Sequence, residues 1–286
     1  MSNQDLSWAV PVMRAGYAGR GVVYLVVAGF SLFALWHGGQ AKGTSSALAQ
    51  LERSTWGGLV LFLIFVGMVA YAIWRSLDAT YDLEEYGTDG KGMVARAGMI
   101  VTGINHLALG IAAFLLLFTS GSGEGGGGSS SIVKAVDTVM GWPAGRWLVG
   151  IAGLATLGAG IYYGIKAVKE KYREHLRANS FTTRWNWVLK AGVLAQGVIV
   201  TIIGCFIVYA AWTANPDEAG GVGEAFSWLN GQIYGQVLVA IVCVGLLGFA
   251  IFCFVNAAYR VVPKVAGDDV MTLARRAKQK AERKVS

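Results

Sequence analysis

The residues that stand out for their chemistry are polar or ionisable side chains set inside long apolar stretches. They are Arg20, Tyr24, Thr102, Asn105, His106 and Gln196. An ionisable group within lipid is costly, which makes it a candidate for binding or transport. A guanidinium recognises carboxylate and phosphate groups, and an imidazole exchanges a proton near neutral pH. Together these side chains predict a site for an anionic headgroup or small anion.

Other chemistry finds little support. Cys205, Cys243 and Cys253 lie in apolar runs and are interpreted as buried hydrophobic residues. The three histidines fall in separate segments, so no two of them are expected at one membrane depth, as haem ligation between helices requires. No Walker loop, nucleophile elbow or zinc-protease helix is present. We therefore expect no enzyme activity, no metal and no cofactor.

The composition explains where such residues sit. The chain has 286 residues, 55% hydrophobic and 14% charged, whereas soluble domains carry about 25% charged residues. Its mean hydropathy is +0.51. The net charge of +7 raises the possibility of nucleic-acid binding, but the cations flank the apolar runs and form no continuous patch. The composition indicates a membrane protein that does not bind nucleic acid.

Six apolar stretches are each long enough to cross a hydrocarbon core of about 30 Å. They cover residues 17–36, 57–74, 98–118, 147–165, 191–212 and 236–255. Lipid supplies no hydrogen-bond partners for the backbone, so these stretches must be helices. The first is long enough for a span, which favours a membrane helix over a signal peptide.

The distribution of Lys and Arg predicts the orientation. The termini and the connections around residues 75–96 and 166–190 carry twenty of these residues, and the other connections carry four. By the positive-inside rule, both termini face the cytoplasm. The sequence thus predicts a multi-pass protein of the bacterial inner membrane.

The apolar stretches form a unit of two helices that occurs three times. The first helix of each unit opens with Arg14-Ala15-Gly16, Arg96-Ala97-Gly98 or Lys190-Ala191-Gly192. The second helix carries Gly67, Gly158 or Gly248, followed four residues later by Tyr71, Tyr162 or Phe252. The units are 10–76, 92–167 and 186–257, followed by a basic tail at 263–286. The predicted fold class is all-α, a six-helix transmembrane bundle of three parallel two-helix repeats.

These motifs resemble the bacterial membrane family of unknown function called DUF1206, over roughly residues 10 to 260. The resemblance implies an integral membrane protein with tandem two-helix repeats, and it brings no catalytic residues. The third unit departs from the pattern: Lys190 replaces the opening Arg, and Asn256 stands where the others have Arg75 and Lys166. A mechanism shared by the three units would be altered there.

Superimposing the units places Arg20, Thr102 and Gln196 at one equivalent position. A pseudo-threefold ring would gather them into a polar layer in the cytoplasmic half, whereas asymmetric packing would separate them. The alternative to a binding site is structural: Arg20 extends its guanidinium to the interface, and His106 forms a hydrogen bond with Gln196.

Small residues are expected to form the helix contacts, because they let backbones approach closely in lipid. The positions singled out are Gly21, Gly103, Gly160, Gly164 and Gly197. Before each returning helix lies a short semi-apolar piece, at 47–51, 132–136 and 226–229, expected to lie along the outer surface as an interfacial helix.

Two charged segments are candidate contacts. The acidic connection 76–90 and the basic connection 166–190 either dock on one another or remain solvated beside the headgroups. The tail is expected to form a basic helix on an anionic leaflet, with Val270, Leu273 and Ala274 as an apolar stripe.

The sequence thus favours a non-enzymatic structural or accessory protein that binds membrane lipids or a membrane partner. A transporter of small solutes or ions, with a central site between the repeats, is the alternative.

Overall fold

A computed structural model describes residues 6–118, 131–265 and 271–278. Among them, six helices are long and apolar enough to cross a membrane. They are α1 (Ala9–Trp36), α3 (Gly57–Tyr81), α4 (Gly90–Leu116), α6 (Gly145–Val168), α8 (Asn186–Thr213) and α10 (Gly235–Tyr259). Shorter elements join them: α2 (Thr44–Glu52), α5 (Ser131–Met140), η1 (Lys171–His175), α7 (Ser180–Arg184), η2 (Pro216–Glu218) and α9 (Val222–Asn230). The all-α, six-helix prediction is confirmed, and this is the architecture of a multi-pass membrane protein.

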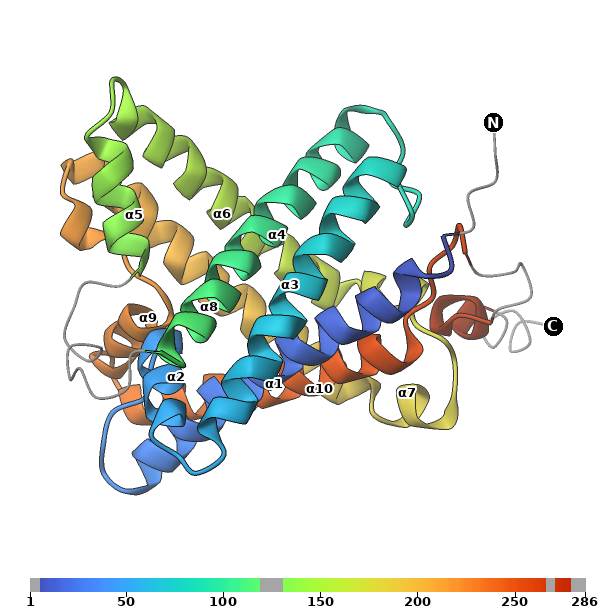
Figure 1. The fold of residues 1–286 in the computed structure, drawn as a ribbon, viewed down its shortest axis with the longest axis horizontal. Helices are drawn as coiled ribbons and strands as arrows, with labels where there is room; N and C mark the ends of the chain where they lie inside the picture. The colour runs from blue at the N-terminus through green and yellow to red at the C-terminus, as the bar shows by residue number, and fades with distance from the viewer. Residues whose placement is uncertain (1–5, 119–130, 266–270, 279–286) are drawn as a thin grey trace.

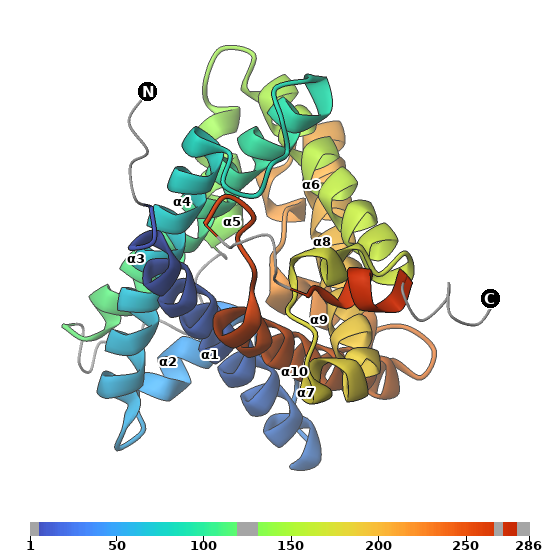
Figure 2. The same ribbon diagram turned by 90° about the vertical axis from the view of Figure 1, so that its right-hand side faces the viewer.

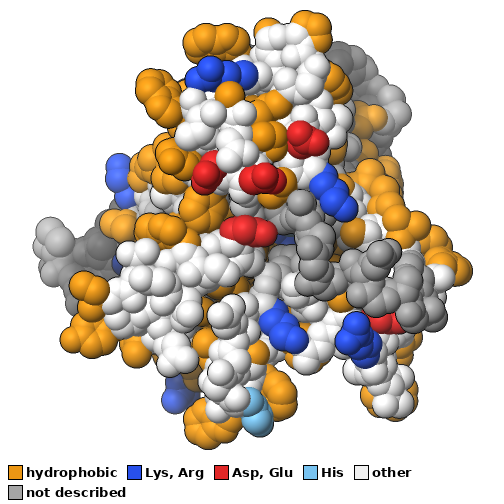
Figure 3. Space-filling model, turned by 90° about the vertical axis from the view of Figure 1, so that its left-hand side faces the viewer, with side chains coloured by type: hydrophobic (Ala, Val, Ile, Leu, Met, Phe, Trp, Pro, Cys, Tyr) orange, Lys and Arg blue, Asp and Glu red, His pale blue; other side chains and the backbone are white. Residues whose placement is uncertain are grey.

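The long helices extend beyond the apolar stretches that predicted them. At 24 to 28 residues each, they are about 36 to 42 Å long, more than a hydrocarbon core requires. The extra turns lie mainly at the end where α1 begins and α10 ends, called here the terminal end. The opposite end carries α2, α5 and α9 and is called the hairpin end (Figure 1). Figure 3 looks onto the hairpin end, where charged side chains of both signs are scattered among hydrophobic ones.

The six long helices form a ring that follows the order of the chain (Figure 2). Helix α1 packs on α3, α3 on α4, α6 on α8, α8 on α10, and α10 returns to α1. Each repeat therefore contacts the next in the same way, through the second helix of one and the first helix of the following one. This is a pseudo-threefold ring, one of the two arrangements that the repeats left open, with one departure: α4 and α6 do not pack along each other.

In repeats 1 and 3, glycines let the two long helices of the repeat pack directly on each other, and such a contact is called here a closed seam. In repeat 1, a Cβ added to Gly19 would lie 2.5 Å from the Cα of Gly67 on α3. In repeat 3, a Cβ on Gly192 would collide with the backbone of Gly248 on α10. In repeat 2, Gly98 corresponds to Gly192 and Gly158 corresponds to Gly67 and Gly248, and a Cβ on either would meet nothing within 4 Å. Repeat 2 is thus open where the other two repeats are closed.

Two short helices fill the hairpin half of the ring. Leu48 of α2 and Phe226 of α9 are each 1% exposed and pack with apolar residues of the long helices. The two helices meet where Gly43 approaches Gly223. The expectation that these pieces lie along the outer surface is therefore wrong for α2 and α9, because their apolar faces reach into the ring. Helix α5 instead packs beside α6 and η2.

At the terminal end, three connections form one junction. Glu84, which follows α3, pairs with Arg260, which follows α10. Isolated bridges join Leu176 to Arg260 and Arg177 to Thr272, so the segment after α6 is tied to the C-terminal segment. Leu273 is 2% exposed and packs in the protein, which corrects its assignment to a membrane-facing stripe. Ala274 is half-buried, and Val270 lies outside the described residues.

Candidate functional site

Arg20 lies at the centre of the ring, in its terminal half, and is 4% exposed. Its guanidinium donates hydrogen bonds to the hydroxyl of Tyr71 on α3 at 3.0 Å and of Tyr163 on α6 at 3.5 Å. The rings of Tyr24, Tyr71 and Phe249 surround it, with centroids 5.6, 5.3 and 5.0 Å from Cζ. Four helices therefore position one cation by phenol groups and aromatic faces.

A second layer of charge lies between Arg20 and the terminal end. Arg75, one turn beyond Tyr71, donates to the hydroxyls of Tyr71 and Tyr17 and pairs with Asp78 at 3.3 Å. Arg260 pairs with Glu84, and its Nη1 donates to Oδ1 of Asn256 at 2.6 Å. Both of these arginines have carboxylate partners.

Arg20 differs from them. Across the described ranges it forms no ion pair, and its Nε has no hydrogen-bond partner. Lys166 on α6 lies within electrostatic range of Arg20, Arg75, Arg260 and Glu84 and likewise forms no ion pair there. The cluster thus holds three arginines against the carboxylates of Asp78 and Glu84, with the amine of Lys166 beside them. An excess of positive charge inside a ring of apolar helices favours an anion.

The remaining candidates from the sequence are dispersed. His106 on α4 is 8% exposed; its ring lies 4.7 Å from that of Tyr71, and its Nδ1 is 2.8 Å from the carbonyl of Thr102. Gln196 on α8 is 6% exposed, and its Oε1 has no partner. The expected hydrogen bond between His106 and Gln196 is absent from the described interactions. Tyr24 joins the Arg20 cluster, whereas Thr102 bonds back to Gly98 and Asn105 is exposed.

The packing glycines behave as expected with one exception. Gly21 faces the ring of Phe254, Gly103 faces Arg75, and Gly160 and Gly197 lie in the contact between α6 and α8. A Cβ on Gly164 would meet nothing within 4 Å. Gly164 differs in that its own Cβ would face a groove on the outside of the ring, but its backbone nitrogen would lie 3.1 Å from a Cβ on Gly197, so it remains part of the contact between α6 and α8.

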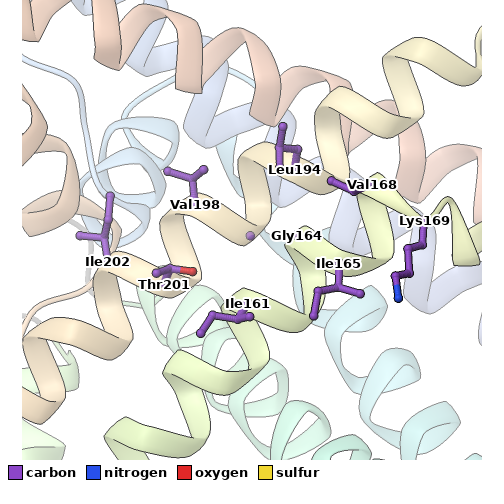
Figure 4. A pocket seen from close by; sticks show the side chains of 11 residues that line it. Ile161, Gly164, Ile165, Val168, Lys169, Leu194, Val198, Thr201 and Ile202 are labelled. Atoms are coloured by element: carbon purple, nitrogen blue, oxygen red, sulfur yellow. The ribbon is translucent and has the colours of Figure 1, made fainter.

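That groove runs between α6 and α8 and has a volume of about 520 Å³ (Figure 4). Ile161, Ile165, Leu194 and Val198 line it, and Lys169 stands at its terminal end. Such a surface accommodates an acyl chain, but it contains none of the residues that contact Arg20.

The junction at the terminal end holds two groups with shifted pKa values. Burial alone would raise the pKa of Glu84, but Arg260, Arg75 and His175 together outweigh it and lower that pKa to about 2. Burial, reinforced by Arg260, lowers the pKa of His175 to about 4. Glu84 is thus charged and His175 neutral at neutral pH. The acidic connection docks mainly on the C-terminal segment, and its Tyr86 also stacks on His175 with ring centroids 6.4 Å apart.

Sequence reasoning missed several members of the cluster. Tyr71 was noted only as a repeat marker, and the roles of Tyr163, Glu84 and Arg260 were not anticipated. A usable signal existed for Arg75, which stands at equivalent positions to Lys166 and Asn256 at the terminal ends of the returning helices. No group of three or more potential metal-ligating side chains occurs in the described part of the chain.

Comparison with known proteins identifies the family. The family model "Domain of Unknown Function (DUF1206)" matches residues 15–82, 97–170 and 191–260. The chain belongs to the DUF1206 family. The three matches coincide with the three repeats of the ring, so the DUF1206 unit is one pair of long helices with its short helix at the hairpin end.

The chain also has a relative in Bacillus subtilis. The chain is 27% identical over 257 residues to "Uncharacterized protein YxxB" of Bacillus subtilis (strain 168), covering 88% of this chain and 92% of that protein. No solved structure matches the chain. Because DUF1206 is a family of unknown function, the geometry of the cluster is the guide to the role.

Proposed function

We propose that this protein is a non-enzymatic, multi-pass protein of the bacterial inner membrane that binds the anionic group of a ligand at Arg20. The terminal end faces the cytoplasm, because the connections and termini there carry twenty of the 24 Lys and Arg residues. The basic residues of this end also contact anionic lipid headgroups.

The observation that carries this proposal is the unpaired state of Arg20. A buried charge without a counter-ion costs several kcal/mol even after relaxation. Phenol hydrogen bonds and aromatic faces recover part of this cost but supply no negative charge. An incoming phosphate or carboxylate would neutralise the charge and accept from the unpartnered Nε. The cluster is therefore suited to hold an anion.

The filled hairpin half favours a binding protein over a transporter. A solute that crossed the ring from Arg20 would have to displace the buried side chains of Leu48 and Phe226. That core is apolar, and its packing would cost free energy to open. Apart from Ser31, the buried polar side chains of the described long helices lie in the terminal half or near mid-depth, as expected for a site reached from one side.

The test is thermal unfolding of the purified protein in an uncharged detergent, titrated separately with phosphatidylglycerol and with inorganic phosphate. A ligand at a hundredfold its Kd adds about 2.7 kcal/mol, or a shift in Tm of about 5 °C or more. We expect at least one of the two to stabilise the wild-type protein and Arg20→Lys, but not Arg20→Gln. Lys190→Gln removes a more exposed cation and is the matched control. Equal stabilisation of Arg20→Gln, or of neither protein, contradicts the proposal.

A further inference from the structure

We propose that the ligand is an anionic phospholipid of the surrounding bilayer, which enters the ring sideways between α4 and α6 and places its phosphate between Lys166 and Arg20. This inference rests on the proposed function and adds the class of ligand and its route. It is carried by the open seam of repeat 2, by a polar side chain within that seam and by an unpaired cation at its terminal end.

The open seam is visible in the exposure of equivalent residues. Tyr71 of repeat 1 and Phe252 of repeat 3 are 0% and 5% exposed, whereas Tyr162 of repeat 2 is 46% exposed. Gly98 and Gly158 are exposed too, although their equivalents in both other repeats are buried. The helices α4 and α6 do not pack along each other, so this side of the ring lacks the contact that closes repeats 1 and 3. The opening faces the bilayer, because it lies between two transmembrane helices.

A polar group lies within this opening. Asn105 corresponds to Val23 and Ile199, which are 4% and 2% exposed and belong to the apolar core. In repeat 2 the position is exposed, and its amide makes no hydrogen bond within the described parts of the chain. An amide that faces lipid without a partner costs free energy. The ester and glycerol oxygens of a phospholipid would accept its N–H groups, which hydrocarbon alone cannot do.

An unpaired cation lies at the terminal end of the opening. Lys166 is the equivalent of Arg75 and Asn256. Arg75 pairs with Asp78, and Asn256 binds Arg260 and the carbonyl of Phe252. Lys166 has neither kind of contact among the described interactions and is half-buried. Tyr163, whose hydroxyl accepts from Arg20, lies three residues before Lys166 on α6, about one helical turn further from the terminal end.

The route distinguishes a lipid from a dissolved anion. The hairpin side is filled by apolar side chains, and the terminal side is covered by the buried pair of Glu84 and Arg260, whose side chains are 0% and 5% exposed. The residues of repeat 2 that correspond to the closed contacts of the other repeats, Val101, Gly158 and Tyr162, are exposed. Apolar walls suit acyl chains and repel a hydrated ion.

The test compares the two faces of α6 by the same substitution. Gly158→Leu fills the opening, and Gly164→Leu fills the outer groove; both positions have open space at Cβ, so both variants should fold. Purified proteins are titrated with phosphatidylglycerol, zwitterionic phosphatidylcholine and inorganic phosphate, and thermal stabilisation is measured. We expect phosphatidylglycerol to stabilise the wild type and Gly164→Leu, with at least tenfold weaker binding in Gly158→Leu and in Lys166→Gln. Phosphatidylcholine and phosphate should have little effect.

Each other outcome has a defined meaning. Equal binding of phosphatidylglycerol by Gly158→Leu and the wild type overturns the lateral route, and loss in Gly164→Leu alone moves the lipid to the outer groove. Stabilisation by inorganic phosphate that depends on Arg20, with no effect of the lipid, overturns this inference and leaves the proposed function intact. No stabilisation by either overturns both. Dimers that Gly158→Leu dissociates would place a second copy of the chain in the opening and overturn the lipid.

Discussion

Repeats 1 and 3 are closed and repeat 2 is open, although all three share the same opening and closing motifs. The difference lies in two positions of the first helix. Gly19 and Ala195 correspond to Val101, and Val23 and Ile199 correspond to Asn105. A β-branched side chain holds two helices apart where glycine lets them touch, and an amide resists burial in an apolar seam. The shared glycines permit the contact, but the residues between them decide whether it forms.

The largest effect is expected from the junction that ties repeats 1 and 3 together. Glu84→Gln leaves Arg260 buried without a counter-ion, and removing one partner of a buried pair costs about 3 to 5 kcal/mol. Unfolding in detergent at neutral pH measures this loss. Glu85→Gln, one residue along and exposed, is the control and should change little.

The pair of Glu84 and Arg260 at this junction also predicts that the protein loses stability at acid pH. The pKa of Glu84 is about 2 in the folded protein, below its ordinary value of 4.5, so the unfolded chain takes up the proton first as pH falls. The stabilisation is complete above about pH 4.5 and is lost as the pH falls towards 2. A stability profile of Glu84→Gln as steep as that of the wild type in this range would contradict the assignment.

The next effect compares equivalent glycines of a closed and an open repeat. Gly192→Ala forces a Cβ into the backbone of α10 and should cost about 1 to 3 kcal/mol. Gly98→Ala meets open space and should be neutral, or stabilising by up to about 1 kcal/mol through helix propensity. Equal losses in both variants would show that repeat 2 closes in the membrane as the others do.

The protonation of His175 provides a test of how the connection after repeat 2 is packed in the folded protein. Burial lowers its pKa to about 4, below the ordinary value of 6.5, so the folded protein keeps the ring neutral. Stability should therefore fall as pH decreases from about 6.5 to 4, by roughly 1 to 3 kcal/mol, because the unfolded state binds the proton more readily. In His175→Asn this part of the profile should be flat.

The smallest change in the free energy of unfolding is expected when repeat 2 receives the residues that line the closed seam of repeat 1. The double variant Val101→Gly with Asn105→Val copies the residues Gly19 and Val23. We expect α4 and α6 to approach, with a change in stability of only about 1 kcal/mol because the new contact offsets the glycine penalty. The distance between spin labels near the ends of α4 and α6 measures this directly. An unchanged distance would show that other features hold repeat 2 open.

Much of the fold could be predicted from patterns in the sequence. The length and periodicity of the apolar stretches determine the six helices. The repeated glycines determine which helices pack together, because helix packing in lipid depends on close backbone approach. The pseudo-threefold ring was one of two open arrangements. The opening in repeat 2 was not predicted, because Gly98 and Gly158 look like their packed equivalents and the changes at Val101 and Asn105 lie among shared motifs.

The site was predictable only in part. Arg20 and His106 were found because ionisable groups in apolar helices are rare. The hydroxyls of Tyr71 and Tyr163 were not, because tyrosine is common near membrane interfaces and gives no sign of pointing inward. Partners far apart in the chain, such as Glu84 and Arg260, separated by 176 residues, become visible only once the ring brings its ends together.

The contact between α1 and α10 also sets the order of events during synthesis. At about 5 to 20 residues per second, the ribosome needs roughly 10 to 45 s between releasing Trp36 and releasing Tyr259. Throughout that interval, Arg20 must be shielded by lipid, by the insertion machinery or by the nascent hairpin alone, without Phe249 or the partners that arrive last. A chain truncated before α10 would lack Phe249 and leave this charge permanently without that cover.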